Sequence, residues 1–259
     1  MYEFKENISK EEYIEFTNNY SCCPITQDYR WSEVKSDWDN TLCGLYKDKK
    51  LVGAALLLIK TFPLNLKMIY SPKGFLLNYE SKEDVIEFTK GIKAYAKKIK
   101  AFVVKIDPLI AVSEEYFDTL TTNDTKECPK NYKVNSDLKI KNLKEAGYRH
   151  CGFKKNVGDY IQPRFNMAIS LIDKDNNKLD EASLLNHFKR NAKRYHGDFQ
   201  TKRGVSFICV HDNSYLDDFY RIIKSTEARQ GISLRNKDYF KRIMDAFGSD
   251  ANMYIARVN

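Results

Sequence analysis

The stretch that decides the fold class is Ser81–Pro108, SKEDVIEFTKGIKAYAKKIKAFVVKIDP. It begins with Ser81-Lys-Glu-Asp84, which is typical of a capped helix N-terminus. The apolar residues that follow recur every three or four positions, which predicts one buried helix face: Val85, Phe88, Ile92, Tyr95 and Ile99. The run 101–106 then predicts a strand, which ends at Asp107-Pro108. A helix that leads directly into a buried strand is typical of α/β proteins.

The segments on either side continue this alternation. Before it, we predict a helix capped by Ser9-Lys-Glu-Glu12, a short aromatic helical piece over 26–38, and strands over 41–46, 51–61 and 67–70. After it, we predict helices over 136–146, 181–195, 215–223 and 237–247 and strands over 167–171, 205–210 and 252–258. The region 157–165 separates two periodic parts. The sequence therefore predicts two α/β domains, residues 1–158 and 159–259.

The second part faintly repeats the first. In each part a helix and a segment rich in aromatic residues precede a strand, 41–46 in the first and 252–258 in the second. A hairpin partner for the later strand is expected where the sequence stops. Because a strand without a partner leaves its edge open for pairing, we expect the second domain to be incomplete and the chain to be a truncated version of a two-repeat protein.

The charge balance favours anionic partners. The chain has 259 residues, a net charge of +8 and a pI near 9.0. Nucleic acid, phosphorylated substrates and an anionic membrane surface all fit this balance, which does not choose among them. With 42% hydrophobic residues, the composition is that of a globular protein rather than a disordered one.

The sequence contains no targeting or metal-binding pattern. Residues 1–6 lack the basic and apolar regions of a signal peptide, and the most apolar run, 51–59, is too short to span a bilayer. We therefore expect a cytoplasmic protein. The six cysteines include no C-x-x-C spacing and fit reduced thiols. We predict no metal site and no cofactor.

Two places carry candidate functional residues. Asp107 follows a predicted central strand, where ligand-facing residues are common in α/β sheets; a turn cap is the alternative. The segment Ser225–Phe240 connects two predicted helices and places Arg229, Arg235 and Tyr239 near a helix start. Guanidinium groups beside a helix N-terminus suit a phosphate or diphosphate, whereas the alternative is an ordinary solvated connection.

Five segments of the chain follow one another in a distinctive order. They are Thr26–Lys35 (TQDYRWSEVK), Tyr70–Gly74 (YSPKG), Val104–Pro108 (VKIDP), Ile161–Met167 (IQPRFNM) and Glu227–Phe240 (EARQGISLRNKDYF). Together they resemble the Fem family of transferases, which use aminoacyl-tRNA to add amino acids to peptidoglycan precursors. The resemblance covers essentially the whole chain, and the order of the segments is more specific than any one of them.

The resemblance implies a fold and a substrate. The fold would be two acetyltransferase-like (GNAT-like) domains of mixed sheet flanked by helices, the second incomplete. The precursor, UDP-MurNAc-pentapeptide or its lipid-linked form with a peripheral membrane contact, would lie in a cleft. Lys35 and Arg235 match the residues that hold its diphosphate, and Tyr239 matches a neighbouring contact. Trp38 falls in the same substrate segment as Lys35; a core aromatic and a surface charge are the alternatives for these two residues.

The implied activity is transfer of an amino acid from aminoacyl-tRNA to an amine of the stem peptide. The ester is already activated, so no protein nucleophile is needed. Asp107 matches a carboxylate discussed as a general base, and the hydroxyl of the tRNA could also accept the amine's proton. Basic residues are our candidates for the tRNA acceptor arm, with a solvated face as the alternative: Lys189, Arg190, Lys193, Arg194, Lys202 and Arg203.

Two other functions stay open. An acetyl-CoA-dependent N-acetyltransferase would have the same fold, but it needs a pyrophosphate loop of the form [RQ]-x-x-G-x-[GA], and neither Ser71–Gly74 nor Arg229–Gly231 has that spacing. A non-catalytic module that binds RNA or a protein partner would also fit the charge of +8.

Overall fold

The computed structural model describes residues 1–111, 136–152, 169–173, 175, 177–186, 188 and 202–258. These residues fall into two compact units. The first takes in 1–111, 136–150 and 211–252, and the second takes in 151–152, the described part of 169–210, and 253–258. The predicted domain boundary at 158 lies outside the described residues and stays a prediction.

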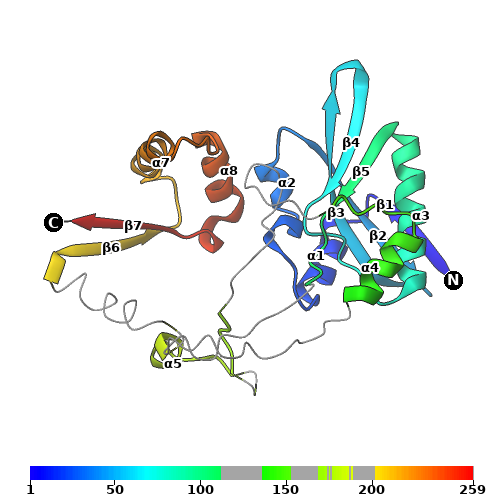
Figure 1. Cartoon of the computed structure of the whole chain (residues 1–259), viewed down its shortest axis with the longest axis horizontal. Helices are drawn as coiled ribbons and strands as arrows, with labels where there is room; N and C mark the ends of the chain where they lie inside the picture. Colours follow the sequence, from blue (N-terminus) through cyan, green and yellow to red (C-terminus); the bar gives the residue numbers. More distant parts are fainter. Residues whose placement is uncertain are drawn as a thin grey trace. The chain divides into compact units, whose positions relative to one another are not determined.

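The first unit is built on a mixed sheet of five strands in the order β1-β2-β3-β4-β5. The strands are β1 (Tyr2–Glu6), β2 (Asp39–Lys47), β3 (Lys50–Phe62), β4 (Leu66–Ser71) and β5 (Ala101–Ile106) (Figure 1). The first four pair antiparallel, and β5 runs parallel to β4. This parallel pair requires a crossover connection, which the helix α3 (Lys82–Lys98) supplies. The strands predicted over 41–46, 51–61, 67–70 and 101–106 are confirmed. The strand β1 was not predicted, because it is short and has no local signal at the chain start.

Helices cover both faces of this sheet (Figure 1). On one face lie α3 and α4 (Ser136–Glu145), and on the other lie α1 (Lys10–Asn18), the 3₁₀ turn η1 (Ile25–Gln27) and α2 (Trp31–Val34). The central strand β3 is buried on both sides: Leu57 packs into the core beneath α3, and Leu56 and Leu58 pack into the core beneath α1. A strand covered on both faces reads as a continuous apolar run. The predicted α/β class, a mixed sheet flanked by helices, is thus confirmed.

The predicted helix starts are capped as the sequence indicated. The Ser9 hydroxyl accepts a hydrogen bond from the Glu12 amide at 3.1 Å, and the Ser81 hydroxyl accepts one from the Asp84 amide at 3.2 Å. Each cap satisfies an amide that has no partner inside its helix. Both caps fix where a helix begins and therefore how it reaches the sheet.

Two further helices of the first unit form a hairpin. α7 (Leu216–Gln230) ends at Gly231, whose φ of 64° is the left-handed conformation that glycine adopts readily. α8 (Lys237–Phe247) begins after Asn236, whose side chain accepts the Tyr239 amide. The rings of Phe219 and Phe240 meet edge to face at 5.1 Å between centroids and join the two helices.

The second unit contains an antiparallel pair of strands, β6 (Val205–Val210) and β7 (Met253–Val258), and the helix α5 (Glu181–Asn186). The strand predicted over 167–171 is not formed at residues 169–171, its described part. The Asp173 carboxylate accepts the amides of Asp175 and Asn177 at 2.8 and 2.9 Å and holds a local turn there instead. Across the described part of the chain, no helix combines the length and apolar character needed to cross a lipid bilayer.

Candidate functional site

The ring of Tyr239, in the first turn of α8, contacts two other predicted site residues, Lys35 and Arg235. Lys35 Nζ and Arg235 Cζ each lie 5.3 Å from the centre of this ring. Trp31 meets the same ring edge to face at 6.5 Å. Cations at this distance from an aromatic face are attracted by its electron density. The structure therefore brings Lys35 and Arg235 to one aromatic side chain although they are 200 positions apart in the sequence.

Trp38 and Lys60 extend this cluster toward the sheet. Lys35 Nζ lies 6.0 Å from the centre of the Trp38 ring system, and Lys60 Nζ lies 5.3 Å from it. Within the described residues, no carboxylate comes within ion-pair distance of Lys35, Lys60 or Arg235. We name Lys35, Lys60, Arg235, Trp38 and Tyr239 the cation cluster. Its cationic groups are held near one another without a described acidic partner.

Burial and the neighbouring cations shift the pKa values of Lys35 and Tyr239. Burial lowers the pKa of Lys35, and the neighbouring Arg235, Arg242 and Lys60 lower it further, while Asp37 acts in the opposite direction. Burial raises the pKa of the Tyr239 hydroxyl, against the effect of Arg235 and Arg242. An anion bound beside Lys35 would offset the repulsion by the neighbouring cations and so favour its charged form.

Two arginines hold α8 against the segment that carries Lys35. Arg242 Nε donates to the Val34 carbonyl at 2.9 Å. Arg30 forms a double hydrogen bond with Asp28, at 3.0 and 2.7 Å, and donates to Asp250 at 2.6 Å. Each of these contacts is charge-assisted, which makes it stronger than a neutral hydrogen bond. They join the middle of α8 and the turn that follows it to the α2 segment, and so hold Tyr239 near Lys35.

Gln27 completes the sheet where β4 leaves it. Leu58 of β3 pairs with Tyr70 of β4, but Leu56 has no strand partner on that side. The buried Gln27 side chain fills the gap: its Oε1 accepts the Leu56 amide at 3.0 Å, and its Nε2 donates to the Leu56 carbonyl at 3.4 Å and to the Pro72 carbonyl at 2.8 Å. The side-chain amide of Gln27 therefore makes the hydrogen bonds that a neighbouring strand would make to Leu56, and it holds the loop after β4 in place.

Asp107 follows β5 and is bound to that same loop. Its Oδ1 accepts the Lys73 amide at 2.7 Å, and its Oδ2 accepts the Tyr70 hydroxyl at 3.0 Å. Burial raises the pKa of the Asp107 carboxyl, and these two donors act against the rise. The carboxylate thus closes the end of the β4–β5 pair, and each of its oxygens keeps a lone pair for a further donor.

The remaining predicted site residues are placed only in part. Arg229 lies exposed in the last turn of α7, and in the described part of the chain no hydrogen bond, ion pair or ring contact joins it to the cation cluster. Lys202 and Arg203 are exposed just before β6. The other proposed tRNA contacts lie outside the described residues: Lys189, Arg190, Lys193 and Arg194. Their roles stay predictions.

Comparison with known proteins gives the family. The sequence matches the FemAB family over residues 8–259, almost its whole length. The chain belongs to the FemAB family. The resemblance inferred from five segments is therefore confirmed.

Individual FemAB relatives match the chain over nearly all its length. It is 30% identical over 261 aligned residues to a lipid II:glycine glycyltransferase of Staphylococcus aureus, an alignment that covers 98% of this chain and 55% of the relative. The glycyltransferase of the bovine strain RF122 / ET3-1 is 29% identical over the same shares. The crystal structure of FemX superposes with a TM-score of 0.76 at 27% identity, covering 99% of this chain and 58% of FemX. The chain thus spans about half the length of the relatives it matches.

Three residues of the site were not predicted from the sequence. Lys60 lies in a strand and reads there as the end of an apolar run; its place beside Trp38 depends on how α2 packs. Arg242 lies on an amphipathic helix, where a solvated charge is the usual interpretation. Gln27 belongs to the Thr26–Lys35 segment, but no pattern in the neighbouring sequence indicates that its side chain is buried and bonds to β3.

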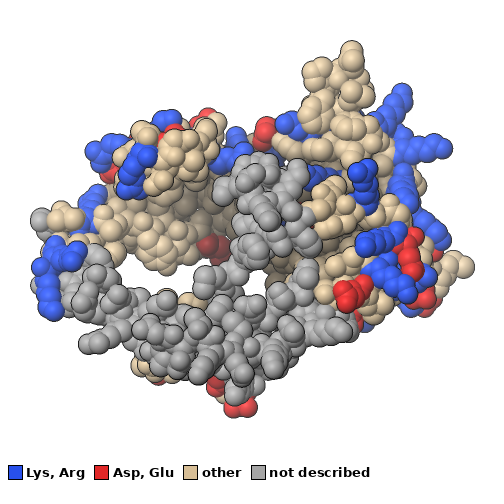
Figure 2. All heavy atoms as spheres, viewed as in Figure 1, with Lys and Arg blue, Asp and Glu red and all other residues tan. Residues whose placement is uncertain are grey.

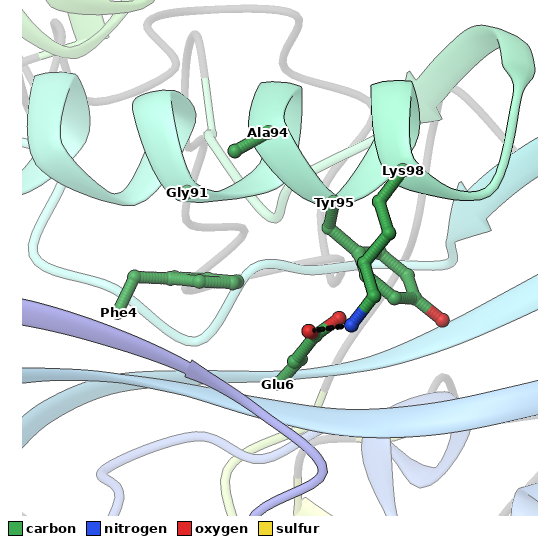
Figure 3. A pocket seen from close by; sticks show the side chains of 6 residues that line it. All are labelled: Phe4, Glu6, Gly91, Ala94, Tyr95 and Lys98. Atoms are coloured by element: carbon green, nitrogen blue, oxygen red, sulfur yellow. Dashed lines mark hydrogen bonds and ion pairs between the residues drawn. The ribbon is translucent and has the colours of Figure 1, made fainter.

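A separate pocket of about 210 Å³ lies between β1 and α3, and none of the predicted site residues lines it. Phe4 and Glu6 line it from the strand, and Gly91, Ala94, Tyr95 and Lys98 line it from the helix (Figure 3). Figure 3 shows the Lys98 ammonium pointing at the Glu6 carboxylate, with which it forms an ion pair. The pocket's main charges therefore neutralise each other, and the cation cluster remains the better candidate for an anionic ligand.

Proposed function

We propose that this chain takes part in transferring an amino acid from aminoacyl-tRNA to the stem-peptide amine of a peptidoglycan precursor. Membership in the FemAB family and the 30% identity to a lipid II:glycine glycyltransferase support this proposal. Because the chain spans about half of such relatives, the complete reaction, its donor and its acceptor are all part of the proposal.

One observation carries the assignment of the precursor: Lys35 and Arg235 lie at equal distance from the Tyr239 ring, and no described carboxylate lies within ion-pair distance of either. A diphosphate presents several negative oxygens to such a pair. The planar guanidinium group can bind two of them at once, and the ammonium group acts as a point charge. Lys35 and Arg235 would therefore hold the diphosphate of UDP-MurNAc-pentapeptide or of its lipid-linked form.

The distance between the cluster and Asp107 suits an extended acceptor. Lys60 pairs with Met68, and Ile106, just before Asp107, pairs with Ser71. The offset along β4 is about four residues, or roughly 13 Å at the usual strand rise. A peptide of four extended residues spans roughly the same distance. A precursor bound by its diphosphate at the cluster could thus extend its stem peptide toward Asp107.

The proposed transfer forms one amide bond and breaks one ester bond. The uncharged amine attacks the carbonyl carbon of the aminoacyl ester, the carbon–nitrogen bond forms, and the bond to the ribose oxygen of tRNA breaks. The amine's proton passes to the departing ribose oxygen, either directly or by way of the Asp107 carboxylate, and this oxygen leaves as a hydroxyl. Burial makes Asp107 a stronger base than an ordinary aspartate, because it raises the pKa of the carboxyl.

Basic residues outside the cluster would bind the donor. Lys202 and Arg203 are exposed ahead of β6, and with Lys189, Arg190, Lys193 and Arg194 they give the sequence a basic stretch suited to tRNA phosphates. Binding through phosphates weakens steeply as salt concentration rises. Replacing the residues Lys202 and Arg203 by glutamate should therefore weaken tRNA binding and flatten its salt dependence.

Calorimetric titration with UDP-MurNAc-pentapeptide tests the precursor site. Arg235→Ala removes one charged partner and should weaken binding by about 10- to 150-fold, the equivalent of roughly 1.5–3 kcal/mol. Arg235→Lys keeps the positive charge but loses the paired donors of the guanidinium group. Its affinity should therefore lie between those of the parent and of Arg235→Ala. Arg221→Ala, which removes an exposed arginine of α7 paired with Asp218, serves as the matched control and should bind like the parent. Equal affinities for the parent and Arg235→Ala would refute the diphosphate assignment.

A further inference from the structure

The hairpin that joins β3 to β4 carries an exposed apolar tip. Its turn residues are exposed, with 93% of Leu64 and 47% of Leu66 accessible to solvent. Phe102, at the start of β5, is 61% exposed and contacts Phe62 of the hairpin at 6.1 Å between ring centres. The hairpin projects beyond the rest of the sheet in Figure 1, and the same projection is mostly uncharged in Figure 2. We name Phe62, Leu64, Leu66 and Phe102 the hairpin tip.

The backbone conformation of the turn does not favour a leucine at position 64. Leu64 and Asn65 both have positive φ, 63° and 56°. Asparagine is common in this left-handed conformation, whereas leucine adopts it at a cost of roughly 1–2 kcal/mol. Glycine, asparagine or aspartate at position 64 would serve the turn better. A side chain that is almost fully exposed and also disfavours its own backbone indicates a role in binding.

Lysines surround the base of the tip. Lys60 and Lys67 lie on the two hairpin strands, and pairing of Lys67 with Ala101 places Lys100 beside the tip as well. Residues 49–79 and 88–106 contain no aspartate or glutamate. In the described part of the chain, no carboxylate lies within ion-pair distance of these three lysines. The hairpin thus combines a convex apolar tip with an unneutralised cationic base.

We infer that the β3–β4 hairpin docks the protein on an anionic lipid bilayer. Apolar side chains at the tip would enter the boundary of the acyl chains, while the lysine ammonium groups stay among the acidic headgroups. This occupant matches both features. A protein partner would need a larger contact area than this narrow projection offers, and single-stranded nucleic acid would stack on aromatic rings rather than cover an exposed leucine.

Lys60 links this surface to the cation cluster. Its Nζ lies 5.3 Å from the ring centre of Phe62 in the hairpin tip and 5.3 Å from that of Trp38 in the cluster. A bilayer at the hairpin would therefore bring its headgroups close to Lys35 and Arg235. If the proposed function holds, this geometry favours the lipid-linked precursor as acceptor, because the diphosphate of that precursor lies at the membrane surface.

Vesicle co-sedimentation tests the docking surface directly. The probe is vesicles of phosphatidylglycerol and phosphatidylcholine in equal parts, compared with vesicles of phosphatidylcholine alone. The parent chain should bind the anionic vesicles, and less tightly at high salt. Leu64→Asp should weaken this binding at least about tenfold, since it puts a charge where the leucine would enter the bilayer. Lys67→Gln and Lys100→Gln should each weaken it by about fivefold.

Ile222→Asp is the matched control. Ile222 is 54% exposed on α7, away from the hairpin in the sequence, so this variant makes the same change of character at another exposed site. It should bind vesicles like the parent. Equal loss in both aspartate variants, no binding to anionic vesicles by the parent, or a dimer in light scattering that Leu64→Asp disperses in the absence of vesicle binding would overturn the inference.

Binding of soluble UDP-MurNAc-pentapeptide separates this inference from the proposed function. Leu64→Asp should bind the soluble precursor like the parent, because Leu64 does not belong to the cation cluster. A parent chain that binds anionic vesicles but binds neither the soluble precursor nor the lipid-linked precursor added to those vesicles would refute the proposed function and support the hairpin. A parent chain that binds the precursor but not the vesicles would refute docking by the hairpin and support the proposed function.

Discussion

Replacing Gln27 by leucine should destabilise the first unit by about 2–6 kcal/mol. The magnitude follows from the three groups that the glutamine amide serves. The Leu56 amide would have no acceptor in the described core, which costs about 1–3 kcal/mol for a buried donor. The Pro72 carbonyl keeps the Thr26 hydroxyl and the Leu56 carbonyl keeps the Ser71 hydroxyl. Each of these two carbonyls therefore loses one hydrogen bond, worth about 0.5–1.5 kcal/mol, but not its last partner.

Urea unfolding followed by tryptophan fluorescence measures this loss. Both tryptophans of the chain, Trp31 and Trp38, lie in the first unit and report on it. Gln230→Leu makes the same substitution at an exposed position at the end of α7 and should change the free energy of unfolding by less than about 0.5 kcal/mol. If Gln27→Leu falls within the same range, Gln27 does not complete the sheet and the reasoning is refuted.

A second substitution separates loss of hydrogen bonds from loss of shape. Gln27→Glu keeps an acceptor for the Leu56 amide, but its carboxylate cannot donate to the Pro72 carbonyl. Protonation restores that donor. Burial should raise the pKa of the introduced carboxyl in the folded state, so the variant should approach the stability of the parent below the unfolded pKa of about 4.3 and lose stability as pH rises. A variant whose deficit is independent of pH would contradict this role.

Three further perturbations follow from the same contacts. Gly74→Ala would place its new methyl carbon 2.5 Å from the Ser71 hydroxyl and should lower the free energy of unfolding by about 1–3 kcal/mol; unchanged urea midpoints would contradict this crowding. Arg30→Ala removes the double hydrogen bond to the partly buried Asp28 carboxylate and the link to the exposed Asp250, and it should cost about 1–2 kcal/mol, against less than about 0.5 kcal/mol for the exposed Arg221→Ala. Because the folded pKa of Asp107 is raised above its ordinary 3.8, protonation stabilises the fold below the unfolded pKa, and this contribution is lost as pH rises through the folded pKa. The stability of the parent relative to Asp107→Asn should therefore fall over that interval, and a difference that stays flat with pH would refute the buried environment of this carboxylate.

The local signals in the sequence predicted most of the first unit. Capping residues at Ser9 and Ser81, the 3.6-residue apolar spacing of α3 and the apolar run of β3 act between neighbours in the chain, and each produced the expected element. The strand β1 was missed because five residues at the chain start become a strand only by pairing with β2. In the described part of the strand predicted over 167–171, residues 169–171, the hydrogen bonds of Asp173 hold a turn instead.

The sequence by itself determined the types of elements, their order, and the residue types that could bind a diphosphate, because those depend on spacing along the chain. Only the tertiary structure decided which of them meet. Tyr239 gathers Lys35 and Arg235 because Arg242 bonds to Val34 across 208 positions of sequence, and no local pattern encodes such a contact. The same holds for Gln27, whose amide is needed only because the pairing of β4 with β3 ends at Tyr70. Contacts of this kind depend on packing between distant segments, so they become visible only once the chain is folded.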